Sequence, residues 1–317
     1  MNTKFYKLCT LFLFVFLISC SDDLKLYHER PDEPEPPIIV EPEYYWLLEN
    51  IDYPSDLPGF ITRPSQTFTY NDEDIVKVIT SAKEGDPEII VDYNADKISY
   101  SRVRESGSTT YYDSLVVVLN SRNYADYIIH LTYQERIREG EPVKTKSIDD
   151  STAFKYDADG YLIKLESYRT TGENSSLSNT EEYTYESGNL VKSLSTARTV
   201  TYQYIYAYDD KEHARPTEFC YEMPFNVTSL GQSCWMFPNL PFISDYLGKR
   251  SKNNVIRTEI IRTAKEGAFE PYADINYEYS FNENGLVTSA KLSGMGPGNK
   301  VFEDLEIRFS YLTKEKK

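Results

Sequence analysis

The residues in this chain that could carry out catalysis are few and far apart. Its histidines are His28, His130 and His213, and they show no spacing that is typical of a metal site. The motifs H-E-x-x-H and G-x-S-x-G do not occur. His130 falls in an alternating apolar segment, where a histidine is usually a hydrogen-bonded structural residue. We therefore predict that the protein is not an enzyme and that it holds neither a metal nor a cofactor.

One acidic segment, residues 155–166, partly matches a calcium-binding EF-hand loop. Asp157, Asp159 and Glu166 stand at the third, fifth and twelfth positions of such a loop. Lys155, however, occupies the first ligand position, and the flanking residues alternate as in strands rather than repeating as in helices. A hairpin turn accounts for the same residues, and we predict the turn.

Carboxylates are abundant, with 50 Asp and Glu against 34 Lys and Arg, and the formal net charge is −16. An acidic surface repels phosphate backbones, so nucleic acid is excluded as a partner. With so many carboxylates, some pair must lie as close as a glycoside hydrolase requires, but no two stand among apolar residues that would raise a pKa. A carboxylate-dependent glycan hydrolase is therefore kept as an alternative without candidate residues.

Aromatic residues are the other informative group, with 28 Tyr, 15 Phe and 2 Trp. Most of them should pack in a core or pair across strands, but some could line a binding surface, because flat rings suit the faces of sugars or an apolar ligand. The candidate ligand-binding residues are Trp46, Trp235, Phe237 and Tyr246. The first interpretation is a non-enzymatic binding or structural module for a glycan or another envelope component. A carrier of an apolar ligand or lipid is the second.

The elements that must position these residues are β-hairpins. In residues 154–165, alternating apolar residues lead into the turn Asp157-Ala-Asp-Gly160 and resume after it. Related units occupy residues 183–194 and 279–287, and looser copies without glycine occupy residues 68–76 and 91–98.

Segments that alternate like strands fill most of the remaining chain. The longest ladder is Val200, Tyr202, Tyr204, Tyr206 and Tyr208, which fits a strand and no other element. The predicted strand segments are 68–80, 88–103, 110–120, 124–135, 152–168, 179–195, 199–208, 217–222, 254–263, 272–281, 285–292 and 301–311. Because short turns join them, we predict an all-β, antiparallel, many-stranded meander that curls into an open or incomplete barrel.

Two segments interrupt the alternation. Residues 139–150 begin with a polar connection, and they are the predicted seam if the domain consists of two halves. Residues 223–254 are rich in proline and aromatic side chains, and we predict that they plug one end or face of the sheet. Within them, residues 241–247 are predicted to form one short helix that ends at Gly248.

The N-terminus carries a targeting pattern. Lys4 and Lys7 precede an apolar run over residues 8–18, which is typical of a secretory signal and too short to span a bilayer. Leu17-Ile-Ser-Cys20 resembles the lipobox of bacterial lipoproteins. The resemblance implies a signal peptide over residues 1–19 and acylation of Cys20, so that the membrane is a partner through a lipid anchor.

The remaining chain divides by composition. Residues 20–43 are acidic and rich in proline, which predicts an extended tether, whereas residues 44–317 have the composition of a single large β domain. Ser21-Asp22-Asp23 resembles the surface-export signal of Bacteroidota lipoproteins, but it could equally be the acidic start of the tether. The predicted location is the outer membrane, lipid-anchored, with the periplasmic or the extracellular face left open.

Cys220 and Cys234 are the two cysteines that remain once the signal is removed and Cys20 is acylated. An extracytoplasmic compartment permits a disulfide between them, and two buried free thiols account for the sequence equally well.

The hairpin units resemble two known families. The pattern Tyr156-Asp-x-x-Gly160-x-Leu162 is similar to YD repeats, although the copies here are few and unevenly spaced. The combination of lipobox, acidic proline-rich tether, hairpins and the segment 247–253 resembles a family of uncharacterised Bacteroidota lipoproteins with a porin-like fold. That resemblance covers most of residues 60–317 and implies a fold, but no catalytic residues. Because the predicted strands carry polar residues on their outer faces, "porin-like" would describe their curvature and not a membrane-embedded surface.

Overall fold

A computed structural model describes residues 44–54, 65–83, 85–171, 174–197, 200–212, 243–263 and 267–315. The chain divides into two units, Met1–Glu43 and Tyr44–Lys317, and every described residue lies in the second. Within these ranges no helix is both long and apolar enough to cross a membrane.

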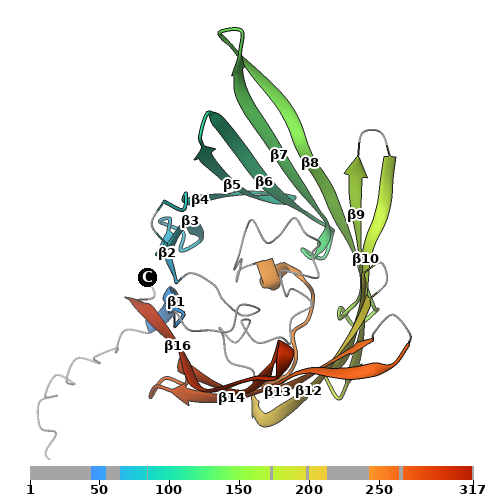
Figure 1. The fold of residues 1–317 in the computed structure, drawn as a ribbon. Coiled ribbons are helices and arrows are strands. Elements are labelled where there is room, and N and C mark those ends of the chain that lie inside the picture. Colours follow the sequence, from blue (N-terminus) through green and yellow to red (C-terminus); the bar gives the residue numbers. More distant parts are fainter. Residues whose placement is uncertain are drawn as a thin grey trace, which may run out of the picture. The chain divides into compact units, whose positions relative to one another are not determined.

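The described chain forms one antiparallel sheet of sixteen strands, joined mostly in sequence order (Figure 1). The strands are β1 Tyr44–Asp52, β2 Gln66–Tyr70, β3 Val76–Ser81, β4 Ile89–Asn94, β5 Lys97–Ser106, β6 Thr109–Leu119, β7 Ala125–Arg138, β8 Glu141–Tyr156, β9 Leu162–Thr171, β10 Asn174–Glu186, β11 Asn189–Ala197, β12 Val200–Glu212, β13 Asn253–Thr263, β14 Phe269–Phe281, β15 Val287–Gly296 and β16 Lys300–Glu315. The predicted all-β antiparallel meander is confirmed. The predicted strand at residues 217–222 lies outside the described residues.

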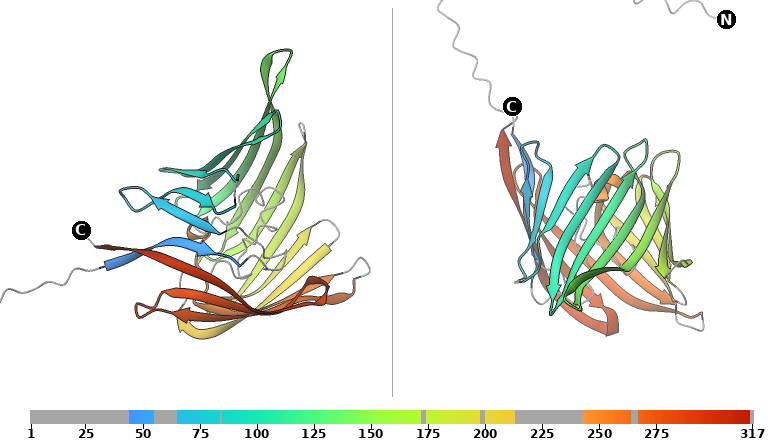
Figure 2. Two further views of the ribbon diagram at one scale, coloured as in Figure 1. Left: turned by 60° about the vertical axis from the view of Figure 1, so that its left-hand side comes forward. Right: turned by 90° about the horizontal axis from the view of Figure 1, so that it is seen from above.

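The sheet closes into a barrel, so the prediction of an open or incomplete barrel is wrong in this respect. The closing strand is β1, which pairs with β16 at eight positions and with β2 at two. The sequence Tyr-Tyr-Trp-Leu-Leu that opens β1 does not alternate, so it gave no strand signal. Figure 2 shows the strands side by side around the barrel.

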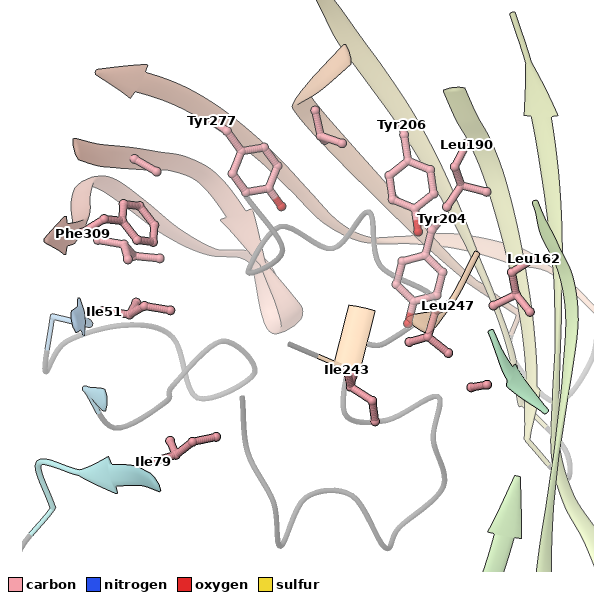
Figure 3. Close-up of a cluster of buried hydrophobic side chains, with 14 of the residues drawn as sticks. Ile51, Ile79, Leu162, Leu190, Tyr204, Tyr206, Ile243, Leu247, Tyr277 and Phe309 are labelled. Carbon is pink, nitrogen blue, oxygen red and sulfur yellow. The ribbon is translucent and has the colours of Figure 1, made fainter. Parts of the chain in front are cut away.

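The apolar side chains point into the barrel (Figure 3). Tyr204 and Tyr206 are buried, and Tyr202 and Tyr208 on the same face of β12 are partly buried against the same core. Each fully buried tyrosine removes roughly 150 Å² from water, which stabilises the fold by a few kcal/mol at about 25 cal/mol per Å². The tyrosine ladder predicted for this segment is thus part of the barrel's core.

A 3₁₀ helix, η3 (Ile243–Tyr246), lies inside the ring of strands (Figure 1). Its Ile243 and the following Leu247 are buried in the core cluster, with exposed fractions of 2% and 3%. The prediction of a short helix near residues 241–247 is therefore confirmed for its described part. A second 3₁₀ turn, η4 (Pro297–Asn299), joins β15 to β16.

Charged pairs cross the strands on the outward face. Arg257, which adjoins the buried Thr258, lies 2.7 Å from Asp274, and Lys155, which adjoins the buried Phe154, lies 3.0 Å from Glu166. Because side chains alternate along a strand, these neighbours of buried residues must point outward. At these positions the outward face is charged, whereas the outward band of a membrane-embedded barrel is apolar.

Four hairpins turn in the same way, at Asn71, Asn120, Asp157 and Asn282. In each turn, the side-chain oxygen of this residue accepts hydrogen bonds from two backbone N–H groups within the next four positions. The residue three positions later has a positive φ in all four: Asp74, Asn123, Gly160 and Gly285. Only glycine, asparagine and aspartate adopt this conformation readily, which explains the D-x-x-G pattern. The calcium-like segment at residues 155–166 is such a turn, as predicted.

Tyrosine hydroxyls form hydrogen bonds between neighbouring strands near many of these strand ends. The phenols of five tyrosines donate to a carbonyl on the preceding strand at 2.5–2.8 Å; they are Tyr70, Tyr156, Tyr208, Tyr279 and Tyr311. Burial raises the pKa of Tyr70, Tyr156 and Tyr311 well above its ordinary value. The aromatic residues of the repeat therefore hydrogen-bond the ends of neighbouring strands together as well as filling the core.

Residues 139–150, the predicted seam, form the turn and the first part of β8 in the β7–β8 hairpin. Glu139 and Gly140, with φ angles of 55° and 89°, make a two-residue turn, and β8 runs unbroken from residue 141. The β7–β8 hairpin projects beyond its neighbours (Figure 1), because pairing with β9 stops at Asp150. Residues 141–146 are exposed there, so their polar composition is accounted for by solvent on both faces of the hairpin.

Candidate functional site

The candidate ligand-binding residues predicted from the sequence lie on separate elements where they can be placed. Trp46 is half-buried on β1, opposite Thr313. Tyr246 is half-buried on η3, where burial and the neighbouring Asp245 raise its pKa. Trp235 and Phe237 lie outside the described residues, as do His28, His213, Cys20, Cys220 and Cys234. The lipid anchor and the disulfide therefore stay predictions.

The segment that follows η3 crosses one end of the barrel and forms hydrogen bonds with its hairpin turns. Residues 247–252, here called the rim strap, cross the turns β8–β9 and β10–β11. The amide of Lys249 donates to the carbonyl of Gly160 at 2.8 Å, and the amide of Lys252 donates to that of Gly188 at 3.0 Å. Ser251 Oγ accepts from the amide of Leu190 at 3.1 Å. These bonds satisfy the outermost backbone groups of two hairpins and fix the entry into β13.

Glycine stands on both sides of this contact, at Gly248 in the strap and at Gly160 in the turn. A Cβ on Gly248 would lie 2.4 Å from the carbonyl oxygen of Gly160, and one on Gly160 would lie 3.0 Å from the hydroxyl of Tyr124. Both glycines also have positive φ. Gly248, predicted as a helix stop, thus has a second role as the contact point between the strap and a hairpin turn.

Four tyrosines and two basic residues surround this contact, and we call this set the rim platform. The tyrosines are Tyr124, Tyr156, Tyr161 and Tyr185, and the basic residues are Arg122 and Lys249. The rings of Tyr124 and Tyr156 have centroids 5.2 Å apart, and those of Tyr161 and Tyr185 are 4.7 Å apart. Arg122 lies 5.2 Å from the Tyr124 ring, and Lys249 lies 5.4 Å from the Tyr161 ring. All four rings are half-buried, while both cations are exposed.

This chemistry suits a polar ligand with flat faces. Half-exposed rings offer stacking surface, and the exposed cations beside them offer hydrogen-bond donors. Tyr161 packs against the ring of Tyr185, and its hydroxyl lies beside Gly188. Sequence analysis missed the platform because its four rings come from three different turns. The sequence feature that could have indicated the platform is an aromatic residue beside each of these turns, together with basic residues nearby.

A buried charged cluster lies on the inward face of β5–β9. Asp113 is fully buried, and one of its oxygens accepts from Nε of Arg102 at 3.2 Å and from Nε of Arg104 at 3.0 Å. Its other oxygen accepts from the hydroxyl of Thr132 at 2.7 Å. Desolvation lowers the pKa of Arg102, and Asp113 opposes that shift. With three side chains already on its oxygens, Asp113 has the surroundings of a structural carboxylate rather than those of a glycosidase acid.

His130 belongs to the same cluster. Its Nε2 lies 3.4 Å from the Thr132 hydroxyl, and its strand position is opposite Asp150, which pairs with Arg169 at 3.7 Å. Burial lowers the pKa of His130, although Asp113 and Asp150 act in the opposite direction. The histidine is therefore neutral near pH 7 and lies in a hydrogen-bonded site on a strand, as predicted. Within the described ranges no three His, Cys, Asp or Glu side chains form a metal site.

The strand order and closure define the class of protein: an antiparallel, porin-like barrel around an apolar core cluster, with a buried charged cluster on part of its inward face. The chain belongs to the family described as a domain of unknown function (DUF4595) with porin-like fold, which matches residues 119–289. This range runs from the end of β6 into β15 and includes the rim strap and the whole rim platform.

Solved structures of Bacteroides proteins are similar to this chain. A porin-like protein from Bacteroides vulgatus ATCC 8482 is 10% identical, with a TM-score of 0.52 over 84% of this chain and 98% of that chain. A porin-like protein from Bacteroides uniformis ATCC 8492 is 12% identical, with a TM-score of 0.49 over 84% of this chain and 96% of that chain. No curated protein matches the chain. At these identities the likeness to the Bacteroides vulgatus protein concerns the fold alone.

Proposed function

We propose that the protein is a lipid-anchored protein of the outer membrane whose barrel is a non-enzymatic glycan-binding module. The observation that carries the proposal is the rim platform, in which four half-buried tyrosines and two exposed cations meet on a rigid set of turns. Rings held in place by packing lose little conformational freedom on binding, which favours them as ligand contacts. The signal pattern and Cys20 support the anchor.

The binding test uses full-length protein in detergent and a panel of neutral hexasaccharides, measured by isothermal titration calorimetry. Tyr161→Ala should weaken binding of the preferred hexasaccharide at least ten-fold, about 1.4 kcal/mol, because it removes a stacking face. Tyr112→Ala is the matched control, since Tyr112 also lies under a lysine, with Nζ of Lys144 3.8 Å from its ring, but on the outer wall of β6. If no hexasaccharide binds, or if both variants weaken binding equally, the platform is not a glycan site.

The anchor has its own test. Cys20→Ser should prevent labelling by a clickable fatty acid in growing cells and should shift the protein from the membrane fraction to the soluble fraction. Protease treatment of intact cells then reports the face, since cleavage with a periplasmic marker left intact indicates the cell surface. A Cys20→Ser protein that stays labelled would contradict lipidation at this residue.

A further inference from the structure

Two arginines on the barrel wall are each fixed to β6 by Nε. Nε of Arg104, on β5, donates to Asp113 at 3.0 Å, and Nε of Arg136, on β7, donates to the hydroxyl of Thr109 at 3.1 Å. Across the parts of the chain that the structure describes, the terminal nitrogens of these two guanidiniums contact no protein acceptor. Each guanidinium is therefore fixed through its Nε, and its two terminal NH₂ groups can donate hydrogen bonds to a ligand.

Both arginines share the inward face of the wall. Arg104 is paired with Tyr111, and Arg136 is paired with Thr109 two residues earlier on β6. Leu115, on the same face of β6, is fully buried in the core, so this face of the strand points into the barrel. The guanidinium carbon of Arg104 lies 3.9 Å from the centroid of the Tyr111 ring, so stacking fixes the plane of the group. The Arg104 side chain nevertheless stays 32% exposed, and Arg136 is exposed.

Basic side chains gather at this place, although the chain is acidic. Arg102 and Arg104 share the carboxylate of Asp113, while Arg136, on the other side of β6, contacts the neutral hydroxyl of Thr109. Asp86 also acts on Arg102. Arg104 thus shares its counter-charge and Arg136 contacts an uncharged group, which leaves both guanidiniums able to pair with an anionic ligand.

We propose that Arg104 and Arg136 bind a ligand that carries two or more carboxylates, such as an oligosaccharide of uronic acids. A planar guanidinium with both terminal nitrogens available matches a planar carboxylate through two parallel hydrogen bonds. The two groups stand on either side of β6, so one ligand with repeated carboxylates contacts both. The site follows the β5–β6 turn, whereas the rim platform lies on turns at the opposite ends of the strands, so the two sites are independent.

The test is calorimetric titration of the full-length protein with trigalacturonate, cellotriose and inorganic phosphate. Trigalacturonate should bind, and both Arg104→Gln and Arg136→Gln should weaken it at least ten-fold. Arg104→Lys should weaken it nearly as much, because lysine keeps the charge but lacks the paired donors. Arg257→Gln is the control, since this arginine is also paired with a carboxylate but on the outward face.

Four outcomes would overturn the assignment: no binding of trigalacturonate, equal binding of cellotriose, equal loss in Arg257→Gln, or phosphate binding as tightly through the same arginines. Arg136→Gln keeps the test decisive if Arg104→Gln does not fold, because Arg136 is exposed and touches only the Thr109 hydroxyl among described groups. Binding of neutral hexasaccharides at the platform is measured separately, so either proposal can fail alone.

Discussion

At the scale of single residues, Asp113 has the strongest electrostatic constraint. It is fully buried, and its charge is compensated by Arg102, Arg104 and Thr132. Asp113→Asn should lower the free energy of unfolding by about 3–5 kcal/mol, because it leaves two buried or partly buried guanidiniums without their counter-charge. Urea denaturation followed by circular dichroism measures the change.

The matched control for this prediction is Asp274→Asn. Asp274 also pairs with an arginine on a neighbouring strand, Arg257, at 2.7 Å, but both side chains are more than a third exposed. Solvent screens such a pair, so its loss should cost less than about 1 kcal/mol. Equal effects of the two substitutions would show that Asp113 is not the compensated buried charge that its geometry indicates.

The sequence alone could not single out Asp113. It is one of 50 acidic residues, and its burial depends on the register of β5, β6 and β7, which brings Arg102 and Thr132 opposite it. Alternation placed His130 on a strand but did not identify the buried face. Tyr127, on the more apolar face of the segment, is 38% exposed, whereas His130 on the other face is 2% exposed. Trp46 and Tyr246 are aromatic residues on separate elements, and composition carries no information on whether two elements meet.

At the scale of elements, the hairpins were predictable because their turns follow local rules. An Asn or Asp whose side chain accepts from the backbone, followed by a residue that tolerates positive φ, specifies the turn without tertiary contacts. The β7–β8 hairpin escaped prediction at residues 141–150 because neither face is buried near its tip, so alternation is absent. The rim strap was not predicted either, because it bonds to backbone groups of turns that are distant in the sequence.

Gly248 is the residue on which the strap depends, and it allows a controlled test. Gly248→Ala should destabilise the protein by about 1–2 kcal/mol through its positive φ, and by about a further 1–3 kcal/mol through the clash with the backbone of Gly160. Gly140→Ala is the control, because Gly140 has nearly the same φ, 89° against 86°, and nothing within 4 Å of the added Cβ. The difference in thermal unfolding between the two variants measures the contact alone, and equal losses would rule it out.

At the scale of the whole molecule, the barrel is closed unevenly. Strands β1 and β2 pair at only two positions, as do β3 and β4, whereas β6 and β7 pair at eleven. Side chains reinforce the weak closure. Asn50 donates to Ser310 on β16 and accepts from Thr67 on β2, which bridges across β1. Asp74, in the β2–β3 turn, accepts from Tyr45 on β1 and from Lys314 on β16.

This unevenness predicts where the barrel opens first. Local opening breaks the fewest hydrogen bonds along β1–β4, so amides in residues 66–81 should exchange with deuterium faster than those in residues 125–138. Asp74→Asn should accelerate exchange in β1 and β2 further, because it removes the charge that Lys314 contacts while asparagine keeps the positive φ of 61° at this position. Asp304→Asn is the control. Asp304 has a similar positive φ of 54°, is exposed, and lies on β16 outside the part that pairs with β1. Uniform exchange around the barrel, or equal acceleration by both variants, would mean that β1 closes the sheet as firmly as any other strand.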